Sequence, residues 1–149
     1  MKQEFIKYLD SIAITKPIQE RIETIYTFFC EICGNEIKDI FVTDYVKQDG
    51  EREYQNLWFF SENNAMEAKN FIKQDDFDIT PIKKNLNYLN IQKQDYDFKK
   101  SSEKSRLSLK SVFEGGGISG ITGDLKASKE NCDYLRTIIL KYFVRNLKY

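Results

Sequence analysis

Residues 38–61, KDIFVTDYVKQDGEREYQNLWFFS, decide the fold class. Segment 38–47 is rich in β-branched and aromatic residues, which favour strands over helices. The pair Asp49-Gly50 is a turn signal, and segment 53–61 returns to the same strand-like composition. The stretch therefore predicts an antiparallel β-hairpin.

More strands are predicted after this hairpin. Alternating apolar and polar residues, separated by turn residues, predict strands at 65–71, 85–93, 96–100, 106–114 and 121–127. The composition of 65–71, AMEAKNF, also suits a helix, so both interpretations stay open for this segment. Segment 75–81 holds three aspartates and a proline, which predict a bend or an edge strand. With the hairpin, we expect about seven antiparallel strands.

Apolar residues recur at helical spacing near both ends of the chain. Residues 3–13 predict a short amphipathic helix, and Pro17 and Gly34 are placed to begin and end a second one. Near the C-terminus, Ser128 is a good N-cap for a closing helix. The wide apolar stripe of that helix consists of Cys132, Leu135, Ile138, Ile139, Tyr142 and Phe143. We therefore expect two N-terminal helices, the strands, and then one closing helix.

This order of elements resembles the pleckstrin-homology-like (PH-like) barrel, in which seven antiparallel strands precede a C-terminal amphipathic helix. The resemblance covers residues 38–147 and implies that the helix of Lys129–Leu147 closes an open end of the barrel. Two features depart from it. The closing helix lacks the tryptophan common in classical members, because the only tryptophan is Trp58, and the loop 47–53 mixes both charge signs. The resemblance therefore does not imply phosphoinositide binding.

The predicted fold class is α+β, with about seven antiparallel strands in a PH-like barrel, a closing C-terminal helix and two preceding helices. We expect a single domain over residues 1–149, because no linker or repeat divides the chain. Its parts are a helical pair at 1–35, an antiparallel barrel at 36–127 and the closing helix at 128–149. The alternative is a cone-shaped α+β fold, in which helices lie across a curved sheet.

The composition excludes several classes of chemistry. The chain has 149 residues and no histidine, which rules out Ser-His-Asp catalysis and His-ligated metal sites. Its three cysteines fit the reduced thiols of a cytoplasmic protein, and no apolar run is long enough to span a bilayer. We therefore expect a cytoplasmic protein without a transmembrane segment.

Three short motifs are weak matches to functional sites. The string GGGISG at 115–120 contains G-x-G-x-x-G, but predicted strands on both sides fit a hairpin loop and not a dinucleotide site. Cys30 and Cys33 form C-x-x-C near a helix end, where we expect two small core-facing residues. Asp44 and the run EAK at 67–69 faintly resemble a nuclease metal site, a pattern that arises readily by chance. We predict no catalytic residue, no cofactor and no metal site.

The charges are unevenly distributed along a chain of zero net charge. Residues 1–67 hold 7 basic and 13 acidic side chains, whereas residues 83–110 hold 8 basic and 3 acidic ones. The basic residues of the second segment are Lys83, Lys84, Lys93, Lys99, Lys100, Lys104, Arg106 and Lys110. On neighbouring strands their positive charge would spread along one sheet surface and attract an acidic partner. We therefore expect an unknown protein partner, or self-association through the acidic first 67 residues.

These features favour a non-catalytic protein- or ligand-binding module of PH-like type. One alternative is a small-ligand-binding or enzymatic cone-shaped domain, which would need a deep cavity lined by tyrosines, Trp58 and a buried carboxylate. Another is a weak binder of anionic partners through segment 83–110. The zero net charge does not favour nucleic acid as the partner.

Overall fold

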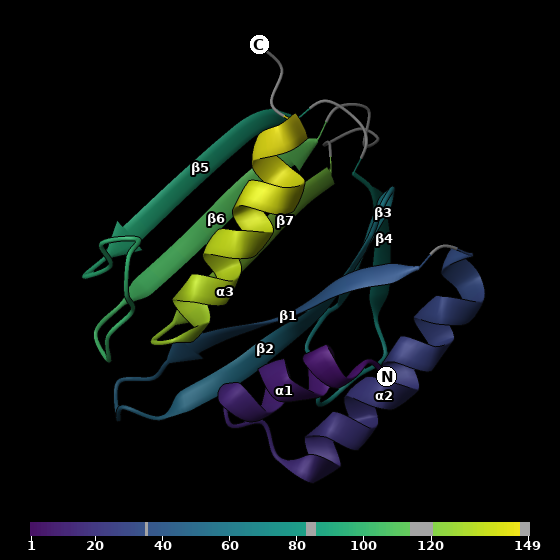
Figure 1. Cartoon of the computed structure of the whole chain (residues 1–149), viewed down its shortest axis with the longest axis horizontal. Helices are drawn as coiled ribbons and strands as arrows, with labels where there is room; N and C mark the ends of the chain where they lie inside the picture. Colours follow the sequence, from purple (N-terminus) through teal and green to yellow (C-terminus); the bar gives the residue numbers. More distant parts are fainter. Residues whose placement is uncertain (35, 83–85, 114–120, 147–149) are drawn as a thin grey trace.

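The computed structural model describes residues 1–34, 36–82, 86–113 and 121–146. In these ranges the chain forms two N-terminal helices, seven strands and a C-terminal helix, in the predicted order (Figure 1). The helices are α1 Gln3–Ser11, α2 Lys16–Cys33 and α3 Asn131–Ile138, which continues as a π-helical turn Ile139–Phe143 and a 3₁₀ turn Val144–Asn146. None of the helices in these ranges is long and apolar enough to cross a membrane. The α+β class is confirmed.

The strands of the described ranges form two antiparallel sheets. The first sheet has the order β1-β2-β3-β4 and the second has the order β5-β6-β7. The strands are β1 Ile37–Val46, β2 Arg52–Ser61, β3 Asn64–Ala68, β4 Phe77–Pro81, β5 Leu86–Gln94, β6 Arg106–Phe113 and β7 Ile121–Ser128. No strand pairing between described residues joins the two sheets, so a closed barrel is not found in this part of the chain.

The structure decides three segments whose prediction was open or is wrong. Segment 77–81 is an edge strand, β4, which pairs with β3. Segment 65–71, which suited both strand and helix, is a strand as far as Ala68. No strand forms at 96–100, because residues 95–105 make one loop between β5 and β6.

Local hydrogen bonds explain why a loop replaces the predicted strand at 96–100. The Asp97 carboxylate accepts the backbone N–H groups of Lys99 at 2.9 Å and Lys100 at 3.1 Å, as in an Asx turn. Asp95 and Phe98 have φ angles of 51° and 67°, in the left-handed region that strands do not use. The alternation of apolar residues in this segment is therefore not a strand signal.

The predicted hairpin is confirmed as β1 and β2, and α2 covers one face of it. Pro17 lies in the first turn of α2, and Gly34 ends the helix at a φ of 69°, which glycine adopts without strain. The apolar side of α2 packs on the sheet, where the Phe29 and Phe59 rings stack with centroids 6.0 Å apart. The first sheet is therefore buried on this face by a helix.

The closing helix α3 fills the space between the two sheets. On β2, Trp58 and Phe60 point to the face opposite Phe59, because successive side chains of a strand alternate. Phe60 stacks on Tyr142 with ring centroids 4.6 Å apart, and Leu135 of α3 is fully buried. Figure 1 shows α3 lying across β6 and β7. The inner face of these strands contributes the buried residues Leu107, Leu109 and Leu125.

The closing helix differs from its prediction at both ends. Ser128 is the last residue of β7, and its hydroxyl donates to Asp44 instead of capping the helix. The helix begins at Asn131, and its α-helical part ends at Ile138. Leu147, the predicted last residue, lies outside the described residues.

The burial of Leu135 gives a test of this packing. Leu135→Ala removes a fully buried side chain and should lower the free energy of unfolding by about 2–4 kcal/mol in chemical denaturation. The control is Leu140→Ala, which truncates a side chain of the same helical segment that is 54% exposed and should have little effect. Equal denaturation midpoints for the two variants would contradict the placement of α3 between the sheets.

Candidate functional site

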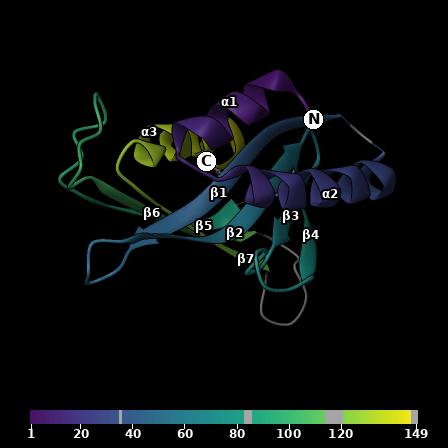
Figure 2. The same cartoon turned by 90° about the horizontal axis from the view of Figure 1, so that it is seen from below.

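Most of the predicted basic residues gather at one end of the second sheet. Because residues 95–105 form a single loop, the cations of this loop lie together with those near the end of β5 and the start of β6. This group, the basic end, consists of Lys93, Lys99, Lys100, Lys104 and Arg106. Figure 2 shows the β5–β6 loop projecting from the rest of the molecule. The expectation that these charges spread along the whole sheet is therefore wrong.

The other three predicted basic residues are not part of the basic end. Lys110 lies in the middle of β6, opposite Asn90 on β5 and Asp124 on β7. Lys83 and Lys84 lie outside the described residues. The structure thus places five of the eight predicted residues at the same end of the sheet, with Lys93 and Arg106 on opposite faces, because Lys93 pairs with Leu107 and Arg106 pairs with Gln94.

Side-chain hydrogen bonds anchor the loop that carries the basic end. The two carboxylate oxygens of Asp133 in α3 accept bonds from the hydroxyls of Tyr96 and Ser101, each at 2.7 Å. The buried Ser105 hydroxyl donates to the Asp95 carbonyl at 2.7 Å. Burial and the bond to Asp133 both raise the pKa of Tyr96, so its hydroxyl stays protonated and donates. The lysines are therefore presented by a loop tied to α3.

The cations of the basic end have no carboxylate partner among the described residues. Lys93 Nζ donates to the Tyr96 carbonyl at 3.0 Å and lies 5.1 Å from the centre of the Phe98 ring. Arg106 Nη1 donates to two backbone carbonyls, at 2.7 and 3.0 Å. These partners are neutral, so the positive charge of the five cations is offset only in part, by the carboxylates of Asp95, Asp97 and Glu103 in the same loop, of which Asp97 interacts electrostatically with Lys93.

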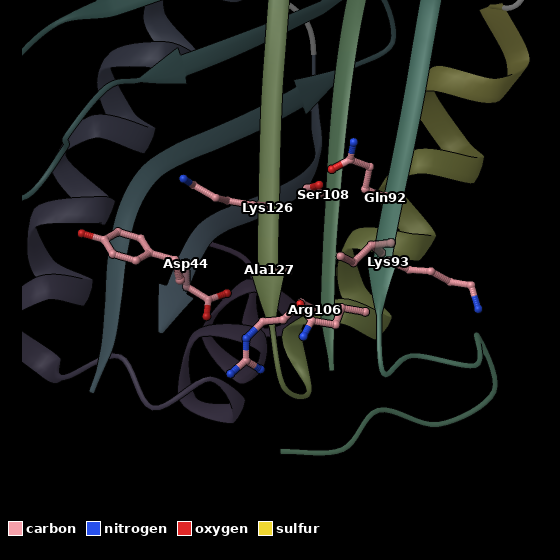
Figure 3. A pocket seen from close by; sticks show the side chains of 10 residues that line it. Asp44, Gln92, Lys93, Arg106, Ser108, Lys126 and Ala127 are labelled. Atoms are coloured by element: carbon pink, nitrogen blue, oxygen red, sulfur yellow. The ribbon is translucent and has the colours of Figure 1, made fainter. Parts of the chain in front are cut away.

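A shallow pocket of about 270 Å³ adjoins the basic end on the outer face of the second sheet (Figure 3). Its polar lining consists of Asp44, Tyr45, Gln92, Lys93, Gln94, Arg106, Ser108 and Lys126. In Figure 3, Lys93 points away from the other labelled residues, whereas Arg106 reaches across the end of β7 toward the Asp44 side. The pocket can therefore offer an anion two cations, Arg106 and Lys126, together with side-chain amides.

Most of this pocket could not be predicted from the sequence. Gln92, Ser108 and Lys126 form one cross-strand row, since Gln92 pairs with Ser108 and Ser108 pairs with Lys126. Such a row depends on the register of three strands, and register leaves no local signal in a single sequence. Only Lys93 and Arg106 of the lining are among the predicted residues.

One of the residues that line the pocket is a buried carboxylate, Asp44, where β1 and β7 meet. Asp44 is only 1% exposed and follows a register shift in β1. One carboxylate oxygen accepts Arg52 Nε at 2.8 Å and the Ser128 hydroxyl. The other accepts the Ser128 amide at 3.1 Å and Asn131 Nδ2 at 2.7 Å. We call these four residues the Asp44 junction, and in it each carboxylate oxygen accepts two hydrogen bonds.

Further bonds connect the Asp44 junction to α1. Arg52 also forms an ion pair with Glu130, which precedes α3. Tyr8 of α1 donates to Asn131 Oδ1 at 2.8 Å and accepts the Val42 N–H at 2.9 Å. Burial raises the pKa of Tyr8 well above its usual value, which keeps the hydroxyl available as a donor. Residues of α1, β1, β2, β7 and α3 therefore meet at one buried carboxylate.

The structure does not bring together the three residues of the nuclease-like pattern. The Asp44 carboxylate is occupied by the donors of its junction. Lys69 pairs with Asp78 at 2.6 Å, and Glu67 lines a different cavity from Asp44. Asp44 therefore has a structural role.

A wider cleft of about 600 Å³ lies between the first sheet and β7, with tyrosines, Glu67 and Asp124 in its lining. Glu67 is half-buried and accepts no hydrogen bond from a described residue. Burial raises the pKa of Glu67 to about 7, helped by the charge of Asp78 and opposed by Lys69. Trp58, its cross-strand neighbour, does not line the cleft. The cleft therefore has two of the three features that the small-ligand alternative requires.

The remaining motifs do not add to either cavity. Cys30 is exposed and Cys33 is partly buried, so the prediction of two core-facing residues is wrong for Cys30. Burial raises the pKa of Cys132 to about 12, which makes it an unreactive thiol. The string at 115–120 lies outside the described residues.

Comparison of this chain with protein families, curated proteins and solved structures found no match. The parts of the molecule that bear on its function are therefore the two cavities, the basic end and the Asp44 junction.

The Asp44 junction predicts a strong dependence of stability on Arg52. Arg52→Met should lower the free energy of unfolding by about 3–5 kcal/mol, because it leaves the buried Asp44 carboxylate without its cation. Adding Asp44→Asn should recover part of this loss, since it removes the uncompensated charge. Urea denaturation of both single variants and the double variant measures the coupling. If the double variant loses the sum of the free energies of unfolding that the two single variants lose, the pairing of Arg52 with Asp44 is contradicted.

The raised pKa of Glu67 predicts a stability that depends on pH. A carboxyl group whose pKa is raised in the folded state stabilises the fold below its unfolded pKa, and this contribution is lost as pH rises through about 7. Glu67→Gln should therefore match wild type near pH 4 and be more stable above pH 8, by about 1–2 kcal/mol after allowance for solvent screening. Denaturation midpoints across this range test it, with the exposed Glu51→Gln as control. A constant difference at all pH values would contradict the prediction.

Proposed function

We propose that this chain is a non-catalytic protein-binding module that binds an acidic protein segment through the basic end. The observation that carries the proposal is the gathering of five cations, without a carboxylate partner among the described residues, on one anchored loop and the strand ends beside it. A charged group of this kind accelerates encounter with a partner of opposite charge.

The proposal includes a PH-like plan for the fold. A four-stranded sheet, a three-stranded sheet and a C-terminal helix packed between them support this plan. The bonds between Asp44 on β1 and Ser128 on β7 support it as well, because they bring the two sheets together at one corner. A barrel of this type leaves its loops and strand ends free for binding.

A protein partner suits the basic end better than a lipid or a nucleic acid does. Exposed apolar side chains lie among the cations, with Ile91 at 41% and Phe98 at 39% exposure. Mixed apolar and charged surfaces are typical of protein interfaces. The β1–β2 turn offers no cationic cluster for a phosphoinositide, because Lys47 pairs there with Glu51. A cytoplasmic location belongs to the same proposal, since it would keep the exposed Cys30 thiol reduced.

A second candidate function is the binding of a small ligand in the cleft that contains Glu67. It is favoured by the cleft volume of about 600 Å³ and by a half-buried carboxylate without a hydrogen-bond donor among the described residues. A ligand that donates a hydrogen bond to Glu67 should raise the melting temperature of wild type and not of Glu67→Ala. A thermal-shift screen of small amines against both proteins tests this candidate.

Charge reversal at the basic end tests the proposed function. The triple variant Lys99→Glu, Lys100→Glu and Lys104→Glu replaces three exposed cations of one loop. A fluorescent oligoglutamate peptide should bind wild type at low salt and be released at high salt. The triple variant should bind it at least roughly tenfold more weakly, as measured by fluorescence anisotropy.

The matched control reverses three exposed lysines far from the basic end along the chain, with Lys7→Glu, Lys38→Glu and Lys47→Glu. This control changes the net charge by the same amount and should retain most of the affinity for oligoglutamate. Equal losses in the two triple variants would show a response to net charge alone and would overturn the proposal. A single-stranded oligonucleotide that binds wild type more tightly than oligoglutamate does would overturn the choice of a protein partner.

A further inference from the structure

The outer face of α2 is acidic and partly apolar. Glu20, Glu23 and Glu31 are exposed on this helix, and Phe28 and Ile32 are 43% and 46% exposed. We call these five residues the acidic face. They lie toward the solvent side of α2, where the described residues in contact with them are Phe77, beside Phe28, and the N-terminal ammonium, beside Glu23.

Helical spacing places the charges of the acidic face in one stripe. Residues Glu20, Thr24, Thr27 and Glu31 follow the spacing i, i+4, i+7 and i+11, which keeps them on one side of a helix. The threonine hydroxyls donate back to the carbonyls of Glu20 and Glu23, at 3.2 and 3.0 Å. The carboxylates are therefore the polar groups that the stripe offers to a partner.

Two of these carboxylates have no cation beside them in the described residues. Glu20 and Glu31 form no ion pair there, and Glu23 is paired with the N-terminal ammonium at 3.5 Å. Arg21, the cation next to Glu20 in sequence, is occupied by Asp75. The negative charge of the acidic face is therefore largely uncompensated.

The apolar part of the acidic face continues onto the first sheet. The Phe28 ring lies 5.4 Å from the ring of Phe77 on β4. Ile79, two residues further along the same strand, is 47% exposed. Large apolar side chains that are exposed in one strip mark a surface for a protein partner.

The basic end and the acidic face have complementary properties. The basic end combines an excess of cations with exposed Ile91 and Phe98, and the acidic face combines an excess of carboxylates with exposed Phe28 and Ile32. Opposite charges around apolar contacts are the arrangement that gives two protein surfaces both attraction and register. Figures 1 and 2 show α2 and the β5–β6 loop on opposite sides of the molecule, so one chain cannot join its own two surfaces.

We infer that this chain associates with itself head to tail, with the basic end of one copy bound to the acidic face of a second copy. The inference rests on the proposed function and names its acidic partner. Because the two surfaces differ and lie on opposite sides, each copy can bind two neighbours. Head-to-tail contacts of this kind produce open chains of molecules or large rings, and not two-fold dimers.

Sedimentation velocity on the full chain tests the inference. At low salt the average sedimentation coefficient of wild type should rise steadily with protein concentration, and high salt should abolish the rise. The triple variant at Lys99, Lys100 and Lys104 and a second triple variant, Glu20→Lys, Glu23→Lys and Glu31→Lys, should each weaken association at least roughly tenfold. Circular dichroism should show that both variants keep the helix and strand content of wild type.

Mixing the two triple variants gives the decisive measurement. In the lysine variant both surfaces are acidic, and in the glutamate variant both surfaces are basic, so neither variant can associate with itself through opposite charges. In an equimolar mixture, each contact between the two different variants again joins surfaces of opposite charge. Association should therefore return in the mixture to within about threefold of wild type, with the same loss at high salt. A variant with Glu4→Lys, Asp49→Lys and Glu51→Lys, which reverses exposed acids outside the acidic face, should behave as wild type.

Two results would overturn the inference. If wild type remains a monomer at every concentration in low salt, the chain does not associate with itself. If the two variants are folded but do not associate when mixed, the contact is not made between the basic end and the acidic face. Neither result affects the binding of oligoglutamate to the basic end. Loss of oligoglutamate binding by wild type would instead overturn the proposed function, so the two failures are distinguishable.

Discussion

The buried carboxylate of Asp44 constrains the arrangement of the whole molecule. A carboxylate that is 1% exposed destabilises a fold by several kcal/mol unless donors surround it. Those donors come from Arg52 on β2, Ser128 at the end of β7 and Asn131 at the start of α3. Since each donor belongs to a different element, only one relative placement of the two sheets and the closing helix satisfies the charge. Apolar packing between the sheets would allow sliding, whereas four directed hydrogen bonds to one side chain do not.

The same constraint explains why the basic end is available for binding. The loop 95–105 is tied to α3 through Asp133, and α3 is in turn positioned by Asn131 at the Asp44 junction. The lysines of the loop are not needed for this anchoring, because hydroxyls and backbone groups supply the bonds. The structural role and the proposed binding role therefore belong to different side chains at this corner, so we expect that the lysines can be changed without affecting the fold. The pocket beside Arg106 and Lys126 lies on the outer face of the same sheet.

Local signals in the sequence were enough for the helices and the first hairpin, and they were not enough for the sites. Pro17 and Gly34 mark the ends of α2 through backbone preferences that act within a few residues. The error at 96–100 arose because Asp97 forms a turn whose hydrogen bonds compete with strand pairing. Asp44 inside a run of β-branched and aromatic residues was a signal of a buried polar group, but its partners lie 8, 84 and 87 residues away. The gathering of the basic end could not be predicted either, because it depends on that missing strand.

The bond between Tyr8 and Asn131 spans 123 residues of the chain. A ribosome makes Tyr8, Asp44 and the cation Arg52 long before it makes Ser128 and Asn131, so during synthesis the first helices and strands exist for some time without these two hydrogen-bond donors to Asp44. At typical elongation rates of about 5–20 residues per second, this interval lasts seconds, much longer than hairpin formation takes. The N-terminal half can therefore form its local structure early, with Asp44 paired to Arg52, but water must supply the remaining hydrogen bonds of this carboxylate until the last strand and helix emerge. The fold can therefore be completed only after Ser128 and Asn131 have been translated. A nascent chain stalled before Ser128 would expose the apolar face of the first sheet to chaperones.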